Sequence, residues 1–438
     1  MTSSVRAIAE AAKRASRTLS TAGSEQRNAA IRAASDLVEQ STRHLIDANS
    51  QDLAAADEML SHGEISGSTY DRLQLTEKKI AGMVQSMLAV VNLPDPIGRV
   101  LQRTELDQGL ILEKITCPLG VLAVIFEARP DAVTQISTLG LKSANAVILK
   151  AGREVERTAS ALVTIIHRAL TSAQLPEGAV SLVTGRESVR ELLNMSELVD
   201  MVIPRGSKQL VDFVQASTRI PVLGHAEGIC HIYVDESASA EMALAIIDDA
   251  KTDYPAACNA AETVLVHEKV ANEFLPKLAE WSRAKQVSLR GCQRTRAILA
   301  NQPVEAVADD EWHYEYSDLT LAVRVVDSIE HAIEHIHTYG SSHTETIVTD
   351  NPQAAERFLN QVDSAGVFHN ASTRFADGYR YGFGAEVGIS TSKLHARGPV
   401  GLEGLTSYKY VLRGSGQVAR DYQGTNAKPF THKRLLPD

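Results

Sequence analysis

The sequence predicts an α/β protein with two parallel-sheet units, and three observations lead to this. Between residues 117 and 223, short apolar stretches alternate with helical ones, which is typical of βαβ units whose parallel sheet is buried on both faces. Near Gly224–Gly228 the same alternation begins again. The 438 residues are also enough for two or three domains of about 150 residues each.

Helices are expected in the N-terminal region. Residues 3–90 are rich in Ala, Glu, Arg and Leu, and apolar side chains recur at helical spacing, as in Ile31, Ala34 and Leu37. Residues 109–116 have strand character, as half of an extended hairpin. The alternation that follows predicts strands at 121–126, 146–149, 180–183, 199–203 and 220–223, with helices at 130–143, 153–173, 187–194 and 207–216 between them.

The second unit has the same kind of pattern. A strand is expected at 229–234 and a helix at 238–251, followed by a strand at 263–266 and a helix that continues to about residue 285. The α/β pattern then runs to about residue 404. The segment 408–413 is strand-like, and such a strand could pair with another subunit.

Composition and charge exclude several classes of function. The formal net charge is −10 and no basic tract occurs, so we expect neither nucleic acid nor an anionic membrane as a partner. No apolar run approaches the ~20 residues that a membrane-spanning helix needs. The N-terminal residues lack the apolar stretch of a signal peptide, and the four cysteines are widely spaced without a C-x-x-C pair. A cytoplasmic protein is therefore expected.

The most informative residue is Cys258, in the segment Asp253–Asn259 (DYPAACN) directly before a strand-like run. A proline and small residues allow another molecule to approach the sulfur closely, and a thiolate held there would be a nucleophile for a carbonyl carbon. A small buried packing residue is the alternative. By itself, the segment leaves open whether such a nucleophile serves a hydrolase, a transferase or a reductase.

Two short segments predict a nucleotide site. Lys150 ends a predicted strand, and ligands of parallel α/β sheets bind beyond the carboxyl ends of strands. Arg205-Gly206-Ser207 follows another strand and opens a helix, where backbone N–H groups favour phosphate. Each segment also has an ordinary interpretation, because many strands end in lysine and many turns contain glycine.

Two further patterns concern metals and anions. His331-Ala-Ile-Glu-His335 matches the H-x-x-E-H zinc motif, but the segment is generally rich in histidine and we expect no metal there. The glycine-rich run from 370 to 404 contains Arg374, Arg380 and Arg397, which could clamp an anionic substrate or could be solvated surface residues.

Four separate stretches form a distinctive set: Val121–Asp131 (VLAVIFEARPD), Asp253–Asn259, the segment 326–347, and the segment 370–401. Together they resemble the γ-glutamyl phosphate reductase (glutamate-5-semialdehyde dehydrogenase) family of the aldehyde dehydrogenase superfamily, and the resemblance extends over nearly the whole chain. The resemblance implies an aldehyde dehydrogenase-like fold with two parallel-sheet α/β domains and a small strand arm. We expect an NADPH-binding domain at 1–102 and 117–227, a catalytic domain at 228–406, and an oligomerisation arm and tail at 103–116 and 407–438.

The resemblance also implies roles for single residues. Cys258 matches the superfamily nucleophile. Lys150 matches the lysine near the adenosine ribose, where the 2′-phosphate of NADPH would lie. Gly206 and Ser207 match the turn under the pyrophosphate, and Glu386 matches the glutamate that holds the nicotinamide ribose. The substrate is expected to bind to three arginines, which are Arg129 in the first stretch, Arg374 and Arg397.

The chain departs from the superfamily pattern at two positions. The general-base glutamate of oxidising aldehyde dehydrogenases is replaced by His225, which suits an enzyme that must not hydrolyse its thioester. The oxyanion-hole asparagine is replaced by Ala128, so the backbone N–H of Cys258 and the side chain of Asn259 become the candidate oxyanion donors.

The expected reaction converts L-glutamyl 5-phosphate and NADPH into L-glutamate 5-semialdehyde, NADP⁺ and phosphate through a thioester on Cys258, the second step of proline biosynthesis from glutamate. No kinase segment precedes the matching stretches, which predicts the stand-alone reductase. We expect a homo-oligomer with transient association to the glutamate 5-kinase that makes the substrate. The alternatives are an acylating dehydrogenase of CoA thioesters, a metal hydrolase, and a non-catalytic scaffold.

Overall fold

The chain forms two compact units in the computed structural model, which describes residues 4–185, 187–225 and 227–435. Unit 1 comprises Met1–Leu223, Phe383–Gly388 and Val400–Asp438, and unit 2 comprises Gly224–Gly382 and Ile389–Pro399. The segments 383–388 and 400–406, which the sequence analysis places in the catalytic domain, therefore belong to unit 1. Hydrogen bonds explain this: Val387 and Val400 pair through their backbones, and Asn145 Nδ2 donates to the carbonyl of Leu405 at 2.8 Å.

The first part of unit 1 is helical, as predicted. Its apolar side chains lie on one side of each helix and pack inward, and the side chains of Ser4 and Thr76 cap the first turns of two of the helices. The helices are α1 (Val5–Leu19), α2 (Ser24–Gln40), α3 (Thr42–Ser61), α4 (Gly67–Leu73) and α5 (Glu77–Asn92).

A parallel sheet with the strand order β5-β4-β3-β6 forms the centre of unit 1. Every residue of β3 and β4 is buried, as expected for strands covered on both faces. The strands are β3 (Val121–Phe126), β4 (Ala146–Ala151), β5 (Val180–Val183) and β6 (Met201–Arg205). The accompanying helices are α6 (Ala132–Lys142), η1 (Arg153–Val155), α7 (Glu156–Ser172), η2 (Glu177–Ala179), α8 (Glu187–Leu193) and α9 (Lys208–Ser217).

The strand predicted at 220–223 is wrong. This segment makes one isolated bridge, between Val222 and Val202 of β6. Val202 donates to the carbonyl of Pro221, and Leu223 donates to the carbonyl of Val202. Pro221 has no N–H with which to extend the ladder, so the pairing stops after a single bridge.

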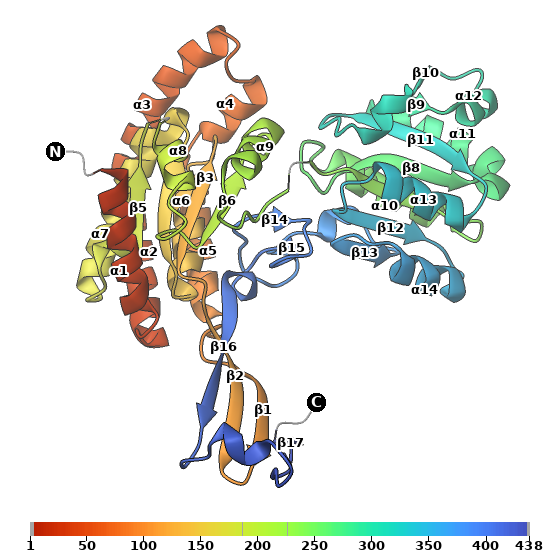
Figure 1. The fold of residues 1–438 in the computed structure, drawn as a ribbon. Coiled ribbons are helices and arrows are strands. Elements are labelled where there is room, and N and C mark those ends of the chain that lie inside the picture. Colours follow the sequence, from red (N-terminus) through yellow and green to blue (C-terminus); the bar gives the residue numbers. More distant parts are fainter. Residues whose placement is uncertain (1–3, 186, 226, 436–438) are drawn as a thin grey trace. The chain divides into compact units, whose positions relative to one another are not determined.

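An antiparallel sheet with the order β16-β2-β1-β17 forms the arm of unit 1. β1 (Val100–Asp107) and β2 (Leu110–Pro118) form the hairpin, and β17 (Lys433–Arg434) is short. β16 (Thr406–Arg413) pairs with β2 along its whole length, from Thr406 opposite Pro118 to Arg413 opposite Ile111. Figure 1 shows β1, β2 and β16 extending together away from the helices of unit 1. Two short 3₁₀ helices, η5 (Glu403–Leu405) and η6 (Ala419–Tyr422), flank β16.

Unit 2 contains a parallel sheet with the order β10-β9-β11-β8-β7-β12-β13. Its central strand β8 is buried at all seven residues, and Val264 and Leu265 belong to separate apolar clusters. The strands are β7 (Cys230–Val234), β8 (Ala261–His267), β9 (Ser288–Gly291), β10 (Val304–Ala306), β11 (Thr320–Val326), β12 (Thr344–Val348) and β13 (Gly366–His369).

Helices cover this sheet and complete unit 2. They are α10 (Ala240–Thr252), α11 (Glu268–Lys285), α12 (Gln293–Ile298), η3 (Asp309–His313), α13 (Ile329–Tyr339), α14 (Pro352–Gln361) and η4 (Thr373–Phe375). A short antiparallel pair, β14 (Ile389–Ser390) and β15 (Gly398–Pro399), also belongs to unit 2. None of the helices described in either unit combines the length and the apolar character needed to cross a membrane.

Candidate functional site

Cys258 lies half-buried in the tight loop that joins α10 to β8. Two turns shape this loop: Ala257 N–H donates to the carbonyl of Tyr254 at 3.1 Å, and Ala260 N–H donates to the carbonyl of Ala257 at 2.8 Å. Gly228 lies directly against the loop, because a Cβ built on it would be 1.8 Å from the Cys258 carbonyl oxygen. The loop is therefore fixed by its own two turns and by the contact with Gly228.

The order of the strands brings distant residues to Cys258. Cys258 precedes β8, Cys230 begins β7, and His343 precedes β12, and these three strands are neighbours in the parallel sheet. All three residues therefore lie at the amino-terminal edge of that sheet. Burial raises the pKa of Cys230 well above its usual range, so Cys230 is a thiol, and its Sγ donates to the Cys258 carbonyl at 3.4 Å.

Two histidines flank the Cys258 thiol. The ring of His225 lies edge-on to the ring of His343, with 5.2 Å between the centroids. His225 Nδ1 is 3.1 Å from the carbonyl oxygen of Ile389, and His343 Nδ1 is 2.9 Å from Thr344 Oγ1. One ligand atom from each of His225, Cys258 and His343 lies within 4.8 Å of the other two. The sequence analysis gave neither Cys230 nor His343 a role, because only the order of the strands places them here.

Asn259 is a positioning residue in this structure. Its Nδ2 donates to the carbonyl of Ala376 at 2.9 Å, its Oδ1 accepts from Arg374, and its carbonyl accepts from Thr373 Oγ1 at 2.7 Å. The side chain is 5% exposed, so these bonds have little competition from water. Its amide is therefore committed to the segment at 373–376, and the Cys258 N–H remains the candidate oxyanion donor.

Arg374 and Arg380 converge on Asp253, at the start of the cysteine loop. Arg374 donates from Nε and Nη2 to Asp253 Oδ2 at 3.2 and 3.1 Å, and Arg380 donates to the same oxygen at 3.3 Å. Hydrogen bonds from Arg374 and then Arg380 lower the pKa of Asp253. Arg374, expected to bind the substrate, is thus engaged in holding the loop against the segment 372–380.

The other predicted substrate arginines have different surroundings. Arg397 donates from Nη1 to Asp363 Oδ1 at 2.8 Å and from Nη2 to the Asp363 carbonyl at 3.0 Å. Bonds from Lys393 and Arg397 lower the pKa of Asp363 to about 2. Arg129 belongs to unit 1, where it is half-buried in the turn between β3 and α6.

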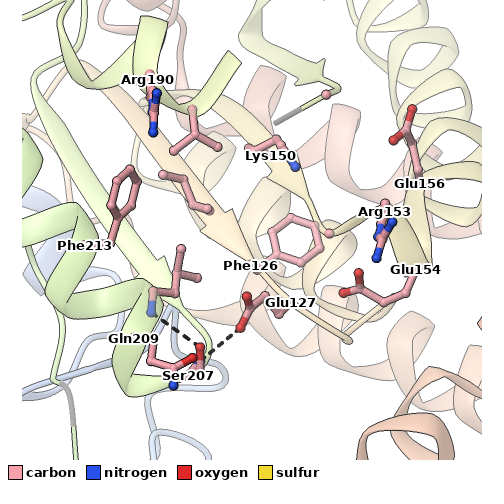
Figure 2. Close-up of a pocket in the computed structure, with 15 residues that line it drawn as sticks. Phe126, Glu127, Lys150, Arg153, Glu154, Glu156, Arg190, Ser207, Gln209 and Phe213 are labelled. Atoms are coloured by element: carbon pink, nitrogen blue, oxygen red, sulfur yellow. Dashed lines mark hydrogen bonds between the residues drawn. The ribbon is translucent and has the colours of Figure 1, made fainter. Parts of the chain in front are cut away.

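Unit 1 contains a cavity of about 760 Å³ at the carboxyl ends of β3 and β4. Figure 2 shows Lys150, at the end of β4, with Glu127, Glu154 and Glu156 around the same space. Lys150 is 9% exposed, and burial lowers its pKa despite these carboxylates. Arg153, Arg190 and Phe213 also line the cavity, although the sequence analysis did not single them out.

The N-terminus of α9 lies at this cavity and holds an anion. The hydroxyl of Ser207 caps the helix by accepting from Leu210 N–H, and Ser207 N–H donates to Glu127 Oε2 at 3.0 Å (Figure 2). A Cβ on Gly206 would lie 2.3 Å from the same carboxylate oxygen, so residue 206 must be glycine for this approach. The turn thus binds a carboxylate where the sequence analysis placed a phosphate.

Two of the predicted cofactor residues are not among the described residues that line this cavity. Gly206 does not line the cavity, but the next residue, Ser207, does. Glu386 is half-buried and lies in the segment Phe383–Gly388, which unit 1 contains. The position of Glu386 relative to the sheet was not accessible from the sequence, since about 180 residues separate it from β6.

The H-x-x-E-H histidines occupy two different environments. His331 is exposed and pairs with Asp327 at 3.2 Å. His335 is 3% exposed, accepts from Arg324 at its Nδ1, and is enclosed by the rings of Trp312 and Tyr339. Burial lowers the pKa of His335 to about 2.

Comparison with known proteins assigns the chain to a family. The sequence model of the aldehyde dehydrogenase family matches residues 2–291. The gamma-glutamyl phosphate reductase of Cyanothece sp. is 53% identical over 98% of this chain and 97% of its own length. Gamma-glutamyl phosphate reductase 1 of Synechocystis sp. is 50% identical over 99% of this chain and 98% of its own.

Solved structures agree with this assignment. The crystal structure of gamma-glutamyl phosphate reductase from Thermotoga maritima matches with a TM-score of 0.91 and 38% identity, covering 95% of this chain and all of its own (100%). An acetylating aldehyde dehydrogenase from Geobacillus thermoglucosidasius matches with a TM-score of 0.65 at 17% identity over 94% of this chain and 97% of its own, which is a likeness of fold.

Proposed function

Because this chain belongs to the gamma-glutamyl phosphate reductases of the aldehyde dehydrogenase family, we propose that it reduces L-glutamyl 5-phosphate to L-glutamate 5-semialdehyde and phosphate with NADPH. This is the second step of proline biosynthesis from glutamate. The observation that carries the proposal is the Cys258 loop, fixed by Gly228 on one side and by the Asp253 arginines on the other. A rigid, half-buried thiol with small neighbours suits attack on an acyl group.

Cys258 carries the covalent chemistry. Its thiolate attacks the acyl phosphate carbonyl, a carbon–sulfur bond forms, the carbon–oxygen bond to phosphate breaks, and inorganic phosphate leaves with the bonding electrons. A bound reduced nicotinamide supplies a hydride to the thioester carbon. Collapse of the resulting hemithioacetal releases the aldehyde and returns the thiolate. The Cys258 N–H is the proposed donor to the oxyanion, a contact that in other enzymes is worth about 3–4 kcal/mol.

His225 favours reduction over hydrolysis of the thioester. It occupies the position of a general-base glutamate, and its Nδ1 is bound to the Ile389 carbonyl. The carboxylate that activates water in oxidising aldehyde dehydrogenases is therefore absent from this position. The thioester would therefore survive long enough to receive hydride.

Unit 1 supplies the proposed dinucleotide site. The cavity beside Lys150 would take the adenosine ribose, and the N-terminus of α9 at Ser207 would take the pyrophosphate after Glu127 gives up its bond there. Lys150, with Arg153 and Arg190 on the same cavity, provides the positive charge that a 2′-phosphate requires. This supports NADPH as the preferred cofactor. Glu386 is proposed to hold the nicotinamide ribose.

Substrate and partners follow from the same proposal. Arg129 and Arg397 are proposed to bind the carboxylate and phosphate of the substrate, while Arg374 acts through the cysteine loop. The arm sheet exposes Tyr408, Tyr410 and Leu412 on β16, which supports its proposed role in a homo-oligomer. Transient association with the glutamate 5-kinase and a cytoplasmic location are part of this proposal.

The decisive assay is the reverse reaction, phosphate-dependent NADP⁺ reduction with glutamate semialdehyde. Activity with phosphate is expected, and activity only with CoA would support a CoA-acylating dehydrogenase instead. Cys258→Ser should abolish turnover while dinucleotide binding persists. Cys292→Ser is the matched control, because Cys292 is also a half-buried free cysteine and its substitution keeps an oxygen to cap α12. Substantial activity in Cys258→Ser would contradict the nucleophile assignment.

A further inference from the structure

His343 has a ring nitrogen without a hydrogen-bond partner. The residue is 1% exposed, and within the described part of the chain its Nε2 is buried and makes no hydrogen bond. A buried polar atom without a partner is rare in native proteins, and a catalytic role is one reason for its presence. One ring nitrogen of His343 lies within 4.8 Å of the Cys258 sulfur, so the reaction proposed above offers such a reason.

Two other histidines of unit 2 share this feature but belong to a different cluster. The Nε2 atoms of His231 and His335 are also buried without a partner among the described residues. Their rings pack edge-on against each other, with 5.3 Å between the centroids, and His231 Nδ1 is 2.9 Å from Glu345 Oε2. The surroundings of His343 are instead the two thiols, Cys230 and Cys258.

The contacts of His343 Nδ1 favour a proton on that nitrogen. Cys230 directs its single proton at the Cys258 carbonyl, 3.4 Å away, so toward His343 Nδ1, at 3.7 Å, its sulfur is an acceptor. Thr344 Oγ1, 2.9 Å from the same nitrogen, can accept as well. With the proton on Nδ1, the lone pair lies on Nε2 and can receive a second proton. Thr344 can then hold the Nδ1–H of the charged ring.

The titratable neighbours of His343 identify the source of that second proton. His225 lies edge-on to the ring, and Cys230 and Cys258 provide two thiols. Burial raises the pKa of Cys230 well above its usual range, so Cys258 is the thiol that can lose its proton. Glu345 follows on the same strand, but its Oε2 accepts from a backbone N–H of β7 and lies 2.9 Å from a ring nitrogen of that strand.

We propose that His343 is the base that takes the proton of Cys258, so that a thiolate and an imidazolium form a pair before the acyl phosphate binds. This inference rests on the nucleophilic role of Cys258 proposed above. The proton moves from Cys258 Sγ to His343 Nε2, and the thiolate attacks the carbonyl carbon. Phosphate leaves with the bonding electrons and takes a proton from water. Collapse of the hemithioacetal expels the thiolate and restores the pair.

The distance between the two side chains is compatible with this role. A separation of up to 4.8 Å is longer than a hydrogen bond to sulfur, but Cys258 is half-buried, so its side chain can rotate toward the ring. Catalytic hydrogen bonds are often long in the absence of substrate and shorten when it binds.

The charged ring also protects the thioester. Once Nε2 of His343 holds the proton, it has no lone pair with which to take a proton from water. His343 therefore activates the sulfur without providing a base for hydrolysis while the thioester exists.

Alkylation of Cys258 by iodoacetamide tests the pair without substrate or cofactor. The full-length, reduced protein is treated at two pH values, and mass spectrometry follows modification of the peptide that contains Cys258. A thiol without a basic partner is only a few per cent ionised near pH 7, so His343→Asn should slow alkylation roughly 10-fold or more at about pH 7. At about pH 10 free cysteine is ionised, so the variant and the unaltered protein should react at similar rates.

Matched variants keep the result interpretable. Asparagine keeps a polar atom close to the position of Nδ1, and a thermal melt checks the fold of His343→Asn. If its thermal midpoint falls, Thr344→Val carries the test, because it removes the acceptor of the Nδ1–H and should slow alkylation with the same pH dependence. His331→Asn changes an exposed histidine and should be alkylated at Cys258 like the unaltered protein.

Three results would overturn the inference. They are unchanged alkylation at about pH 7 in folded His343→Asn, a loss of equal size at both pH values, and slower alkylation in His225→Asn but not in His343→Asn. In the reverse reaction, kcat/KM should fall about 10²–10⁴-fold in His343→Asn, and an unchanged value would refute the catalytic role. Absence of the reverse reaction in the unaltered protein would contradict the proposed function, whereas alkylation would still decide whether the pair exists.

Discussion

Gly228 and Cys258 are in direct backbone contact: a Cβ on residue 228 would lie 1.8 Å from the carbonyl oxygen of Cys258 and 2.6 Å from its Cα. The neighbouring atoms are backbone and cannot rotate away, so Gly228→Ala must displace the cysteine loop. We expect a loss of kcat on the order of 10²-fold, because a shift of about 1 Å at a reacting group has effects of that size. Steady-state kinetics with a thermal melt check this. Gly23→Ala, which meets no atom within 4 Å, is the control; equal kcat in both variants would contradict the prediction.

Lys150→Ala is expected to discriminate between the two dinucleotides. The buried ammonium is proposed to face the 2′-phosphate, and a charge-assisted hydrogen bond is worth about 1.5–3 kcal/mol. The KM for NADPH should therefore rise roughly 10–100-fold, and the KM for NADH should change far less. Lys285→Ala removes an exposed lysine of unit 2 and serves as the control. Equal changes for NADPH and NADH would remove the 2′-phosphate role.

Asp253→Asn should loosen the cysteine loop. The substitution removes the negative charge shared by Arg374 and Arg380, and it leaves the Arg374 guanidinium, whose residue is 9% exposed, without its counter-ion. A lost partner of that kind costs about 1–3 kcal/mol. Urea unfolding should show a lower free energy of unfolding, and steady-state kinetics should show a lower kcat. Glu236→Gln, which breaks the exposed pair with Lys269, should leave the free energy of unfolding nearly unchanged.

His335 should make the stability of the protein depend on pH. Burial lowers its pKa to about 2, whereas the unfolded chain has the ordinary histidine pKa of about 6.5. Between these values the unfolded state binds more protons, so stability falls as the pH drops below about 6.5, by up to about 1.4 kcal/mol per pH unit. His335→Gln should flatten this slope in urea unfolding at pH 7, 6 and 5. The exposed His331→Gln should leave it unchanged, and an unaltered slope in His335→Gln would contradict the assignment.

Much of the fold could be predicted because parallel strands buried on both faces leave continuous apolar runs. β3 and β5 have the predicted bounds for this reason. Helix α6 begins at Ala132, two residues after Pro130, which was expected in its first turn. The assignment of 383–388 to the second unit failed because a chain that returns to an earlier unit leaves no local signal of its return.

The candidate site was predictable only in part. Cys258, Lys150 and Ser207 could be placed in loops or at a strand end because proline, glycine and strand ends mark loops in the sequence. His343 and Cys230 could not be placed beside Cys258, because the pairing of β7 with both β8 and β12 decides this. Arg374 could be recognised in the sequence as a candidate cation for binding an anionic substrate. Its ion pair with Asp253 could not be predicted, because the two residues are distant in the sequence.

The pairing of β16 with β2 has a consequence for synthesis on the ribosome. Pro118 of β2 pairs with Thr406, which is synthesised about 290 residues later. Translation at about 5–20 residues per second takes roughly 15–60 s over that distance. Throughout this time one edge of β2 has no partner from its own chain, and open edges recruit strands from other molecules. Nascent chains that share one polysome are therefore the most exposed to mispairing, so slower initiation or added chaperone should improve the yield of native enzyme more than lowering the temperature after synthesis.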